Sequence, residues 1–269
     1  MERFLYRLSK TRFAENFVLK GALMLIVWEA PLSRPTMDID LLGQIDNNIE
    51  TIVDAIKDIC NQEVEPDGIT FDPGSIEGER ITEVANYEGV RIKLRGALGT
   101  AKITMQLDIG FGDVIIPAAA SLEYPTILDL PAPKLQGYSK ESYIAEKFEA
   151  MVKRGILNSR MKDFFDIWLL LRQFDFKGSS LATAIAKTFS TRGTDIPSET
   201  VGLMKSFTTD MAKATQWHGF TRKIRLTKVP EDFAEVIRAI STFLGPIAKS
   251  LARDLPFKAN WKAPGPWQE

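Results

Sequence analysis

The chain has 269 residues, of which 45% are hydrophobic and 26% are charged. This composition predicts a folded protein of one large domain or two ordinary ones, and it argues against disorder. The formal net charge is −1, which excludes a highly basic nucleic-acid-binding protein but allows a local basic patch. Cys60 is the one cysteine and His218 the one histidine, so an internal disulfide is excluded and catalysis must rest mainly on carboxylates, lysines and arginines.

The first residues, MERFLYRLSK, mix charges with apolar side chains and lack the continuous apolar core of a signal peptide. The most apolar stretch, FVLKGALMLIVW, is too short to span a bilayer and contains Lys20. We therefore expect a soluble, cytoplasmic protein.

The first third of the chain predicts a helix, a strand and a second helix. Apolar residues in 13–28 recur with a roughly helical period that Gly21 interrupts. Residues 36–43, TMDIDLLG, are typical of a short strand that ends at a glycine. Residues 47–60 form a clear amphipathic pattern, with Asn47 or Asn48 as the expected N-cap.

Residues 87–113 predict a β-hairpin. Val90, Ile92 and Leu94 alternate with basic residues, and the segment from Gly96 to Gly99 supplies a turn. The next run alternates in the same way, with Asp108 on its polar face. A proline-rich passage, YPTILDLPAPKLQGYSK, then marks the best domain boundary.

Helical patterns dominate the rest of the chain, strongly at 140–155, 159–174 and 231–252 and more weakly at 180–190 and 198–214. The last sixteen residues contain two tryptophans and three prolines and predict an extended tail. We expect an α+β protein whose mixed sheet and flanking helices (1–135) precede an all-helical C-terminal domain (136–253) and the tail (254–269).

The strand at 36–43 carries two aspartates where a buried strand should be apolar. Because side chains alternate along a strand, Asp38 and Asp40 project from one face. Met37, Ile39 and Leu41 are expected to face the core. Unpaired buried carboxylates are unfavourable, so this pair needs a partner or a function.

Asp108 supplies a third carboxylate if its strand lies next to the strand of Asp38 and Asp40. Three clustered negative charges repel one another and require a cation, and all-oxygen ligands favour Mg²⁺ or Mn²⁺. The alternative is that the aspartates face solvent or pair with Arg34 and Lys93. Spacing by itself does not decide between a metal site and a structural arrangement.

The string FVLKGALML…RPTMDIDLLG…MQLDIGFGD…YIAEKFEAMV…NSRMKDFFDIWLLL resembles the AbiEii/AbiGii toxin family of nucleotidyltransferases, within the DNA polymerase β-like superfamily. The resemblance covers most of the chain. It implies a glycine turn at Gly21, metal-binding and catalytic roles for Asp38, Asp40 and Asp108, and an NTP substrate. The chain departs from the pattern at Ala22, where such proteins usually carry a second glycine or a serine.

The resemblance also implies a role for the helical half. Lys147 lies in an apolar stripe, where it is either a lysine whose stem packs on the core or, as the family implies, a cation directed at nucleotide phosphates. Asp163 and Asp166 are three residues apart on one predicted helix, and either could belong to the site. Asp166 stands among apolar residues and needs a partner, for which Lys147 is the candidate.

Residues beside these motifs are expected to contact the nucleotide. They are Lys20, Gly21, Arg34, Thr36 and Asp163. Two basic clusters could contact an RNA backbone, although each is more simply a solvated surface. The first is Arg91, Lys93 and Arg95, and the second is Arg222, Lys223, Arg225 and Lys228.

By resemblance, the chain transfers a nucleoside monophosphate from an NTP to an acceptor such as the 3′ end of tRNA, and an AbiEi-like antitoxin is its expected partner. Two alternatives remain. The acceptor could be a small molecule or a protein hydroxyl, or the chain could be a nucleotide-binding module without turnover, for which Ala22 is the supporting feature.

Overall fold

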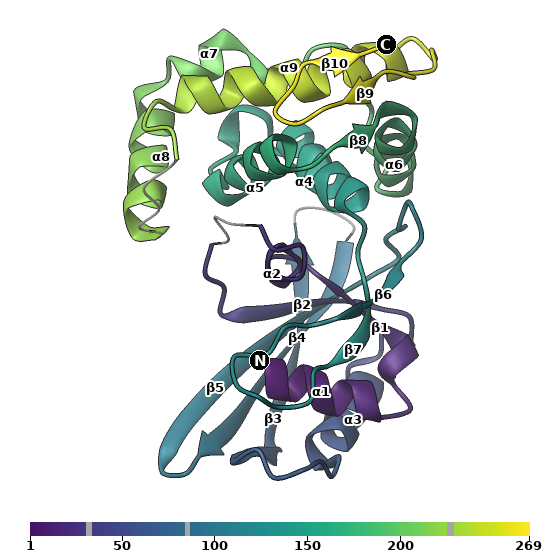
Figure 1. The fold of residues 1–269 in the computed structure, drawn as a ribbon, viewed down its shortest axis with the longest axis vertical. Helices are drawn as coiled ribbons and strands as arrows, with labels where there is room; N and C mark the ends of the chain where they lie inside the picture. The colour runs from purple at the N-terminus through teal and green to yellow at the C-terminus, as the bar shows by residue number, and fades with distance from the viewer. Residues whose placement is uncertain (31–33, 84–86, 225–228) are drawn as a thin grey trace. The chain divides into compact units, whose positions relative to one another are not determined.

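The computed structural model describes residues 1–30, 34–83, 87–224 and 229–269. Within these ranges the chain forms two compact units, which we describe separately (Figure 1). The first comprises residues 1–29, 35–113 and 118–138, and the second comprises residues 30–34, 114–117 and 139–269.

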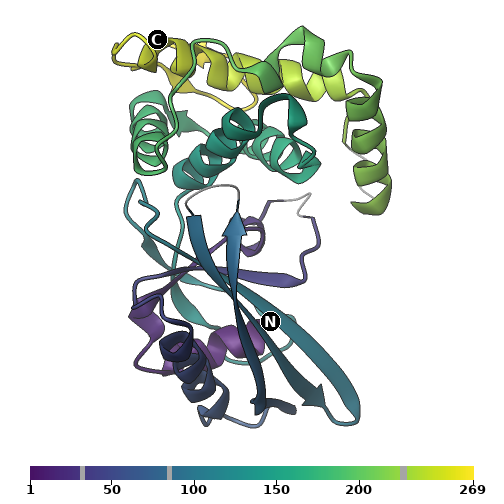
Figure 2. The same cartoon turned by 180° about the vertical axis from the view of Figure 1, so that it is seen from behind.

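A seven-stranded mixed sheet forms the first unit, in the order β3-β4-β5-β2-β1-β7-β6. Its strands are β1 (Phe17–Lys20), β2 (Asp38–Gly43), β3 (Ile69–Glu83), β4 (Tyr87–Leu98), β5 (Ala101–Phe111), β6 (Ala120–Glu123) and β7 (Lys134–Gly137). The β1–β7 and β2–β5 pairs are parallel and the other pairs are antiparallel. Figure 2 shows the long strands β3, β4 and β5 from behind.

Three helices complete this unit: α1 (Glu2–Lys10), α2 (Leu23–Val27) and α3 (Ile49–Asn61). A 3₁₀ turn, η1 (Ala14–Asn16), leads into β1. Asn48 caps α3 by accepting a hydrogen bond from the backbone N–H of Glu50, as predicted. Ile52, Ile56 and Ile59 of α3 are fully buried, so the amphipathic pattern faces the core.

The helical period expected for residues 13–28 is wrong in its first half, because residues 17–20 form strand β1 between β2 and β7. A short apolar run does not distinguish a buried strand from a helix. Met37 is also misplaced, since it precedes β2 and is 84% exposed, whereas Ile39 and Leu41 are buried as expected. The long edge strand β3 was not anticipated.

The second unit is built from helices α4 (Lys140–Arg154), α5 (Met161–Gln173), α6 (Gly178–Thr191), α7 (Lys205–Thr208), α8 (Met211–Ile224) and α9 (Phe233–Leu251). Two 3₁₀ turns, η2 (Gly155–Leu157) and η3 (Val201–Leu203), join them. Aromatic rings form much of the core: Phe164 stacks on Phe207 and contacts Phe233, which stacks on Trp217. Among the described residues, no helix is long and apolar enough to cross a bilayer.

The second unit is not purely helical, which corrects the expected all-helical domain. Three two-residue strands, β8 (Phe176–Lys177), β9 (Asn260–Trp261) and β10 (Trp267–Gln268), form a small sheet. The segment 254–269, expected as an extended tail, packs closely through this sheet. Trp261 is 2% exposed, and its indole N–H donates to the carbonyl of Leu171 at 2.6 Å. The burial of an aromatic ring explains why the segment is ordered.

Candidate functional site

Strand β2 presents two carboxylates on one face. Asp38 and Asp40 are half-buried, whereas the intervening Ile39 is completely buried. The alternation predicted for this strand is therefore present. Thr36 helps to set its start, because the Thr36 hydroxyl donates to the carbonyl of Asp38 at 3.3 Å and accepts from its N–H at 3.4 Å.

The turn after β1 brings a glycine against one of these carboxylates. Lys20 is the register partner of Asp40, and Gly21 follows with φ of +67°. A Cβ at Gly21 would lie 1.9 Å from Oδ2 of Asp40, so a larger residue cannot occupy this position without displacing the carboxylate. The next residue, Ala22, is 2% exposed, and its methyl group is accommodated in the core.

Asp108 lies beside Asp40 across the parallel β2–β5 pair, which confirms that the two strands are neighbours. Its carboxylate, however, is held by Arg91, whose Nε and Nη2 donate to Oδ1 and Oδ2 at 2.8 Å each. The side chain of Gln106 also donates to Asp108 Oδ1 at 3.2 Å. In a hairpin with a two-residue turn at Gly99 and Thr100, residue 91 lies opposite residue 108. The Arg91–Asp108 pair could therefore have been predicted from the hairpin register.

Lys20 is directed to another carboxylate. Its Nζ donates to Oδ2 of Asp113 at 2.8 Å, and the ammonium lies 5.0 Å from the ring centre of Tyr138. The Asp113 side chain is 3% exposed and that of Lys20 is 14% exposed. Lys20 therefore contributes a largely buried ion pair beside the Gly21 turn, an arrangement that the sequence analysis did not predict.

The donor chemistry of Asp38 and Asp40 fits a divalent cation, since carboxylate oxygens are the preferred ligands of Mg²⁺ and Mn²⁺. Within the described part of the chain, no three histidine, cysteine or acidic side chains gather closely enough to hold a metal. Asp108, the third member of the expected triad, is instead bound by Arg91 through both carboxylate oxygens. The pair formed by Asp38 and Asp40 is thus the part of the triad suited to a metal.

The second unit contains a separate cluster of buried charges on α4 and α5. Lys147 Nζ lies 2.9 Å from both Asp163 Oδ1 and Asp166 Oδ2, and both aspartates are at most 1% exposed. Arg34 forms a bidentate pair with Asp166 through Nε and Nη2, each at 3.0 Å. The Tyr143 hydroxyl donates to Asp166 Oδ2 at 2.8 Å. The predicted Lys147–Asp166 partnership is therefore present, and Arg34 joins it.

These contacts set the protonation of the cluster. Burial would raise the pKa of Asp166, but the nearby charges of Lys147 and Arg34 outweigh it and lower that pKa to about 2. Burial alone would lower the pKa of Lys147, yet Asp163 and Asp166 raise it above its ordinary value. The lysine is consequently a cation and both aspartates are anions at neutral pH.

Arg160 adds a third cation to this cluster, and the sequence analysis overlooked it. Its Nε lies 2.8 Å from Asp163 Oδ2, close enough for an ion pair but without the direction of a hydrogen bond. With Arg34, Lys147 and Arg160 against Asp163 and Asp166, the five side chains carry a formal net charge of +1. A lone arginine three residues before an aspartate is a common helix-surface pattern, which is why it went unnoticed.

The two predicted basic clusters differ. On β4, Arg91 pairs with Asp108, and Lys93 lies 3.1 Å from Glu79, so this strand face is largely neutralised by acids. Arg222 and Lys223 lie at the exposed end of α8. Arg225 and Lys228 lie outside the described residues.

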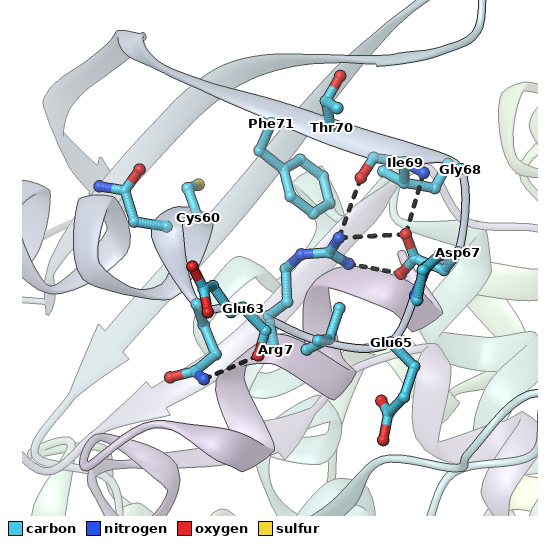
Figure 3. A pocket seen from close by; sticks show the side chains of 13 residues that line it. Arg7, Cys60, Glu63, Glu65, Asp67, Gly68, Ile69, Thr70 and Phe71 are labelled. Atoms are coloured by element: carbon cyan, nitrogen blue, oxygen red, sulfur yellow. Dashed lines mark hydrogen bonds and ion pairs between the residues drawn. The ribbon is translucent and has the colours of Figure 1, made fainter.

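A cavity of about 520 Å³ lies elsewhere in the first unit, between α1, the end of α3 and the loop into β3 (Figure 3). The guanidinium of Arg7 lies in it, bound to Asp67 at 2.7 Å and to the carbonyl of Ile69 at 3.0 Å. Burial would raise the pKa of Asp67, but hydrogen bonds from Arg7 and Arg3 lower it well below the usual range. Arg7, Asp67 and the carbonyl of Ile69 satisfy one another, so we assign the cavity no part in the chemistry.

A glycine turn packed against the second aspartate of a D-x-D strand, in a mixed sheet, is the arrangement expected of a nucleotidyltransferase. The sequence profile of the nucleotidyl transferase AbiEii toxins of type IV toxin–antitoxin systems matches residues 3–239. The chain therefore belongs to the AbiEii nucleotidyltransferase family, and the family implies an NTP substrate and an antitoxin partner.

Solved structures similar to the chain include proteins from two bacteria. JHP933 from Helicobacter pylori is 15% identical over 94% of this chain and 89% of its own, with a TM-score of 0.48. MenT4, a nucleotidyltransferase toxin from Mycobacterium tuberculosis H37Rv, is 13% identical over 93% of this chain and 90% of its own, also with a TM-score of 0.48. No curated protein matches the chain significantly.

Proposed function

We propose that this nucleotidyltransferase transfers a nucleoside monophosphate from an NTP to the 3′ end of an RNA such as tRNA, in a reaction that depends on Mg²⁺ or Mn²⁺. The observation that carries the proposal is the pair Asp38 and Asp40 on one face of β2, with Gly21 packed against Asp40. An AbiEi-like antitoxin would be the partner, and the supply of NTPs points to the cytoplasm.

Asp38 and Asp40 would hold the divalent cation. When bound there, such a cation would supply positive charge to stabilise the negative charge that develops on the departing pyrophosphate. Asp108 would be the third carboxylate of the site. Arg91 binds both oxygens of Asp108, so Asp108 could serve as a metal ligand only while it also binds Arg91. We therefore expect Asp108 to contribute less to metal binding than Asp38 and Asp40.

The turn at Gly21 would lie along the triphosphate, since the absence of a side chain lets a phosphate approach the backbone closely. Lys20 and Thr36 would support this turn and the start of β2 through the contacts described above. In the second unit, Lys147, Arg34 and Asp166 would serve as helpers, and the surplus positive charge of their cluster would favour a phosphate group.

The deciding experiment is a labelling screen. The purified protein is incubated with each α-³²P NTP, Mg²⁺ or Mn²⁺, and RNA, protein or small-molecule fractions. We expect label in the RNA fraction with wild type and none with Asp38→Ala. Label retained by a folded Asp38→Ala protein would contradict the mechanism, and label confined to proteins or small molecules would replace the RNA acceptor.

A further inference from the structure

Basic residues in the second unit are concentrated in two segments that contain no acid. Residues 150–162 and 211–228 together hold nine of the chain's 34 basic residues and none of its 35 acidic residues. The rest of the chain consequently carries a formal net charge of −10. These 31 residues therefore carry a formal net charge of +9 in a protein whose overall net charge is −1.

The structure joins these two segments. Residues 150–162 include the connection from α4 to α5, and α8 occupies most of the other segment. The ammonium of Lys213, on the first turns of α8, donates to the backbone carbonyl of Asn158 at 2.8 Å. Both groups are buried, with Lys213 6% and Asn158 0% exposed. The start of α8 is therefore anchored to the α4–α5 connection, so the described parts of the two basic segments lie next to each other.

The packing of α8 decides which of its side chains face solvent. Trp217 is fully buried against Phe233, and Phe220 contacts Phe165 of α5. The opposite side of α8 is exposed and consists of Thr215, Gln216, His218, Gly219, Arg222 and Lys223. A Cβ added at Gly219 would meet nothing within 4 Å, so this face is open.

We propose that this basic surface, which includes Arg154, Lys162, Arg222 and Lys223, binds the phosphate backbone of the acceptor RNA. Exposed lysine and arginine side chains attract phosphates, and their binding gains affinity from counterion release. The fourteen residues of α8 span about 20 Å, a length that several consecutive phosphates cover. The identity of the RNA as acceptor rests on the proposed function, whereas the binding itself does not.

A protein partner with an acidic face is less consistent with this surface. The exposed side of α8 lacks the large aromatic anchors that dominate protein interfaces, and lysine is depleted in such interfaces. Leu157 and Met211, each 84% exposed, are apolar residues of the same two segments. They are the features that a protein partner would use, so the experiment includes an acidic polypeptide.

The test is an anisotropy titration of fluorescein-labelled deacylated tRNA with the full chain, without NTP, at several salt concentrations. We expect Arg222→Glu with Lys223→Glu to raise Kd at least ~10-fold and to reduce the salt slope by about 1–2, as loss of two phosphate contacts requires. The matched control is Lys249→Glu with Lys258→Glu, which makes the same charge change at two exposed lysines of the same unit. We expect the control to bind like wild type.

Equal weakening by the control, or an unchanged Kd in the α8 variant, would overturn the proposal. So would labelled polyglutamate that binds wild type as tightly as tRNA and loses affinity in the same variant. Circular dichroism would show whether the α8 variant is folded. The neutral variant Arg222→Gln with Lys223→Gln should also weaken RNA binding, because it removes the same two positive charges without adding negative ones. Asp38→Ala should bind RNA normally. If the wild type labels RNA but the Arg222 and Lys223 substitutions leave RNA binding unchanged, only the proposed binding surface is refuted. If the wild type binds RNA through this surface but labels none, only the proposed reaction is refuted.

Discussion

The two units differ in how deeply they bury their paired carboxylates and in how closely cations surround them. In the first unit, Asp38 and Asp40 are half-buried on the face of a strand. In the second unit, Asp163 and Asp166 are buried completely and surrounded by cations. A buried charge is tolerated only when it is paired, whereas a half-buried carboxylate keeps part of its contact with water. The comparison suggests that the first pair is placed for chemistry, whereas the second pair, besides its proposed helper role, holds the helices together.

The largest effect is expected for the β2 pair. Asp38→Ala or Asp40→Ala should lower the rate of NTP-dependent labelling by about 10³-fold or more, because the cation loses a ligand and transition-state charge is no longer stabilised. Urea unfolding should show almost unchanged stability, and Asp108→Asn should lose less activity than either. A large loss of stability without loss of rate would reverse the roles assigned to the two regions.

Asp166→Asn tests the buried cluster. Removing this charge leaves Arg34 and Lys147 incompletely compensated, so the free energy of unfolding should fall by about 3–5 kcal/mol. Asp175→Asn is the matched control, since Asp175 is an exposed aspartate that pairs with Lys262 at 2.7 Å, and it should change stability little. Full labelling by a folded Asp166→Asn protein would contradict the helper role and leave the cluster with stability alone.

Gly21→Ala tests the contact between the turn and Asp40. Alanine at a positive φ costs about 1–2 kcal/mol wherever it is placed. Gly99→Ala provides the control, because Gly99 has φ of +58° and nothing within 4 Å of an added Cβ. Gly21→Ala should lose more stability than Gly99→Ala because of the added clash with Asp40, and it should also lower the labelling rate at least ~10-fold by displacing Asp40. Equal rates in the two variants would show that the contact is unimportant.

The smallest effect is a pH dependence of the second unit. The pKa of Asp166 is about 2 in the folded protein and about 3.9 when unfolded, so its ionised form stabilises the fold above pH 4. This contribution, on the order of 2 kcal/mol, should disappear as the pH falls from about 4 to 2. Urea titrations followed by tryptophan fluorescence would measure it, because four of the five tryptophans lie in this unit. Asp166→Asn should lack this component of the acid sensitivity.

Local patterns were sufficient to predict several elements. Alternation placed Asp38 and Asp40 on one face of β2, and helical periodicity located α3, α4, α5 and α9. They failed for residues 17–20, where an apolar run was compatible with both a helix and a strand. The missing strand mattered, because β1 is the element that delivers Gly21 to Asp40.

The partners of the charged residues depended on contacts between distant segments. Arg34 and Asp166 are 132 residues apart, and no local pattern relates them. The sequence alone established the family motifs and the strand face of Asp38 and Asp40, because these depend on spacing. Tertiary structure decided that Asp108 is held by Arg91, that Asp166 is neutralised by Arg34 and Lys147, and that Lys213 joins the basic segments. The physical reason is that a charge removed from water takes its partner from whichever segment the fold brings within reach.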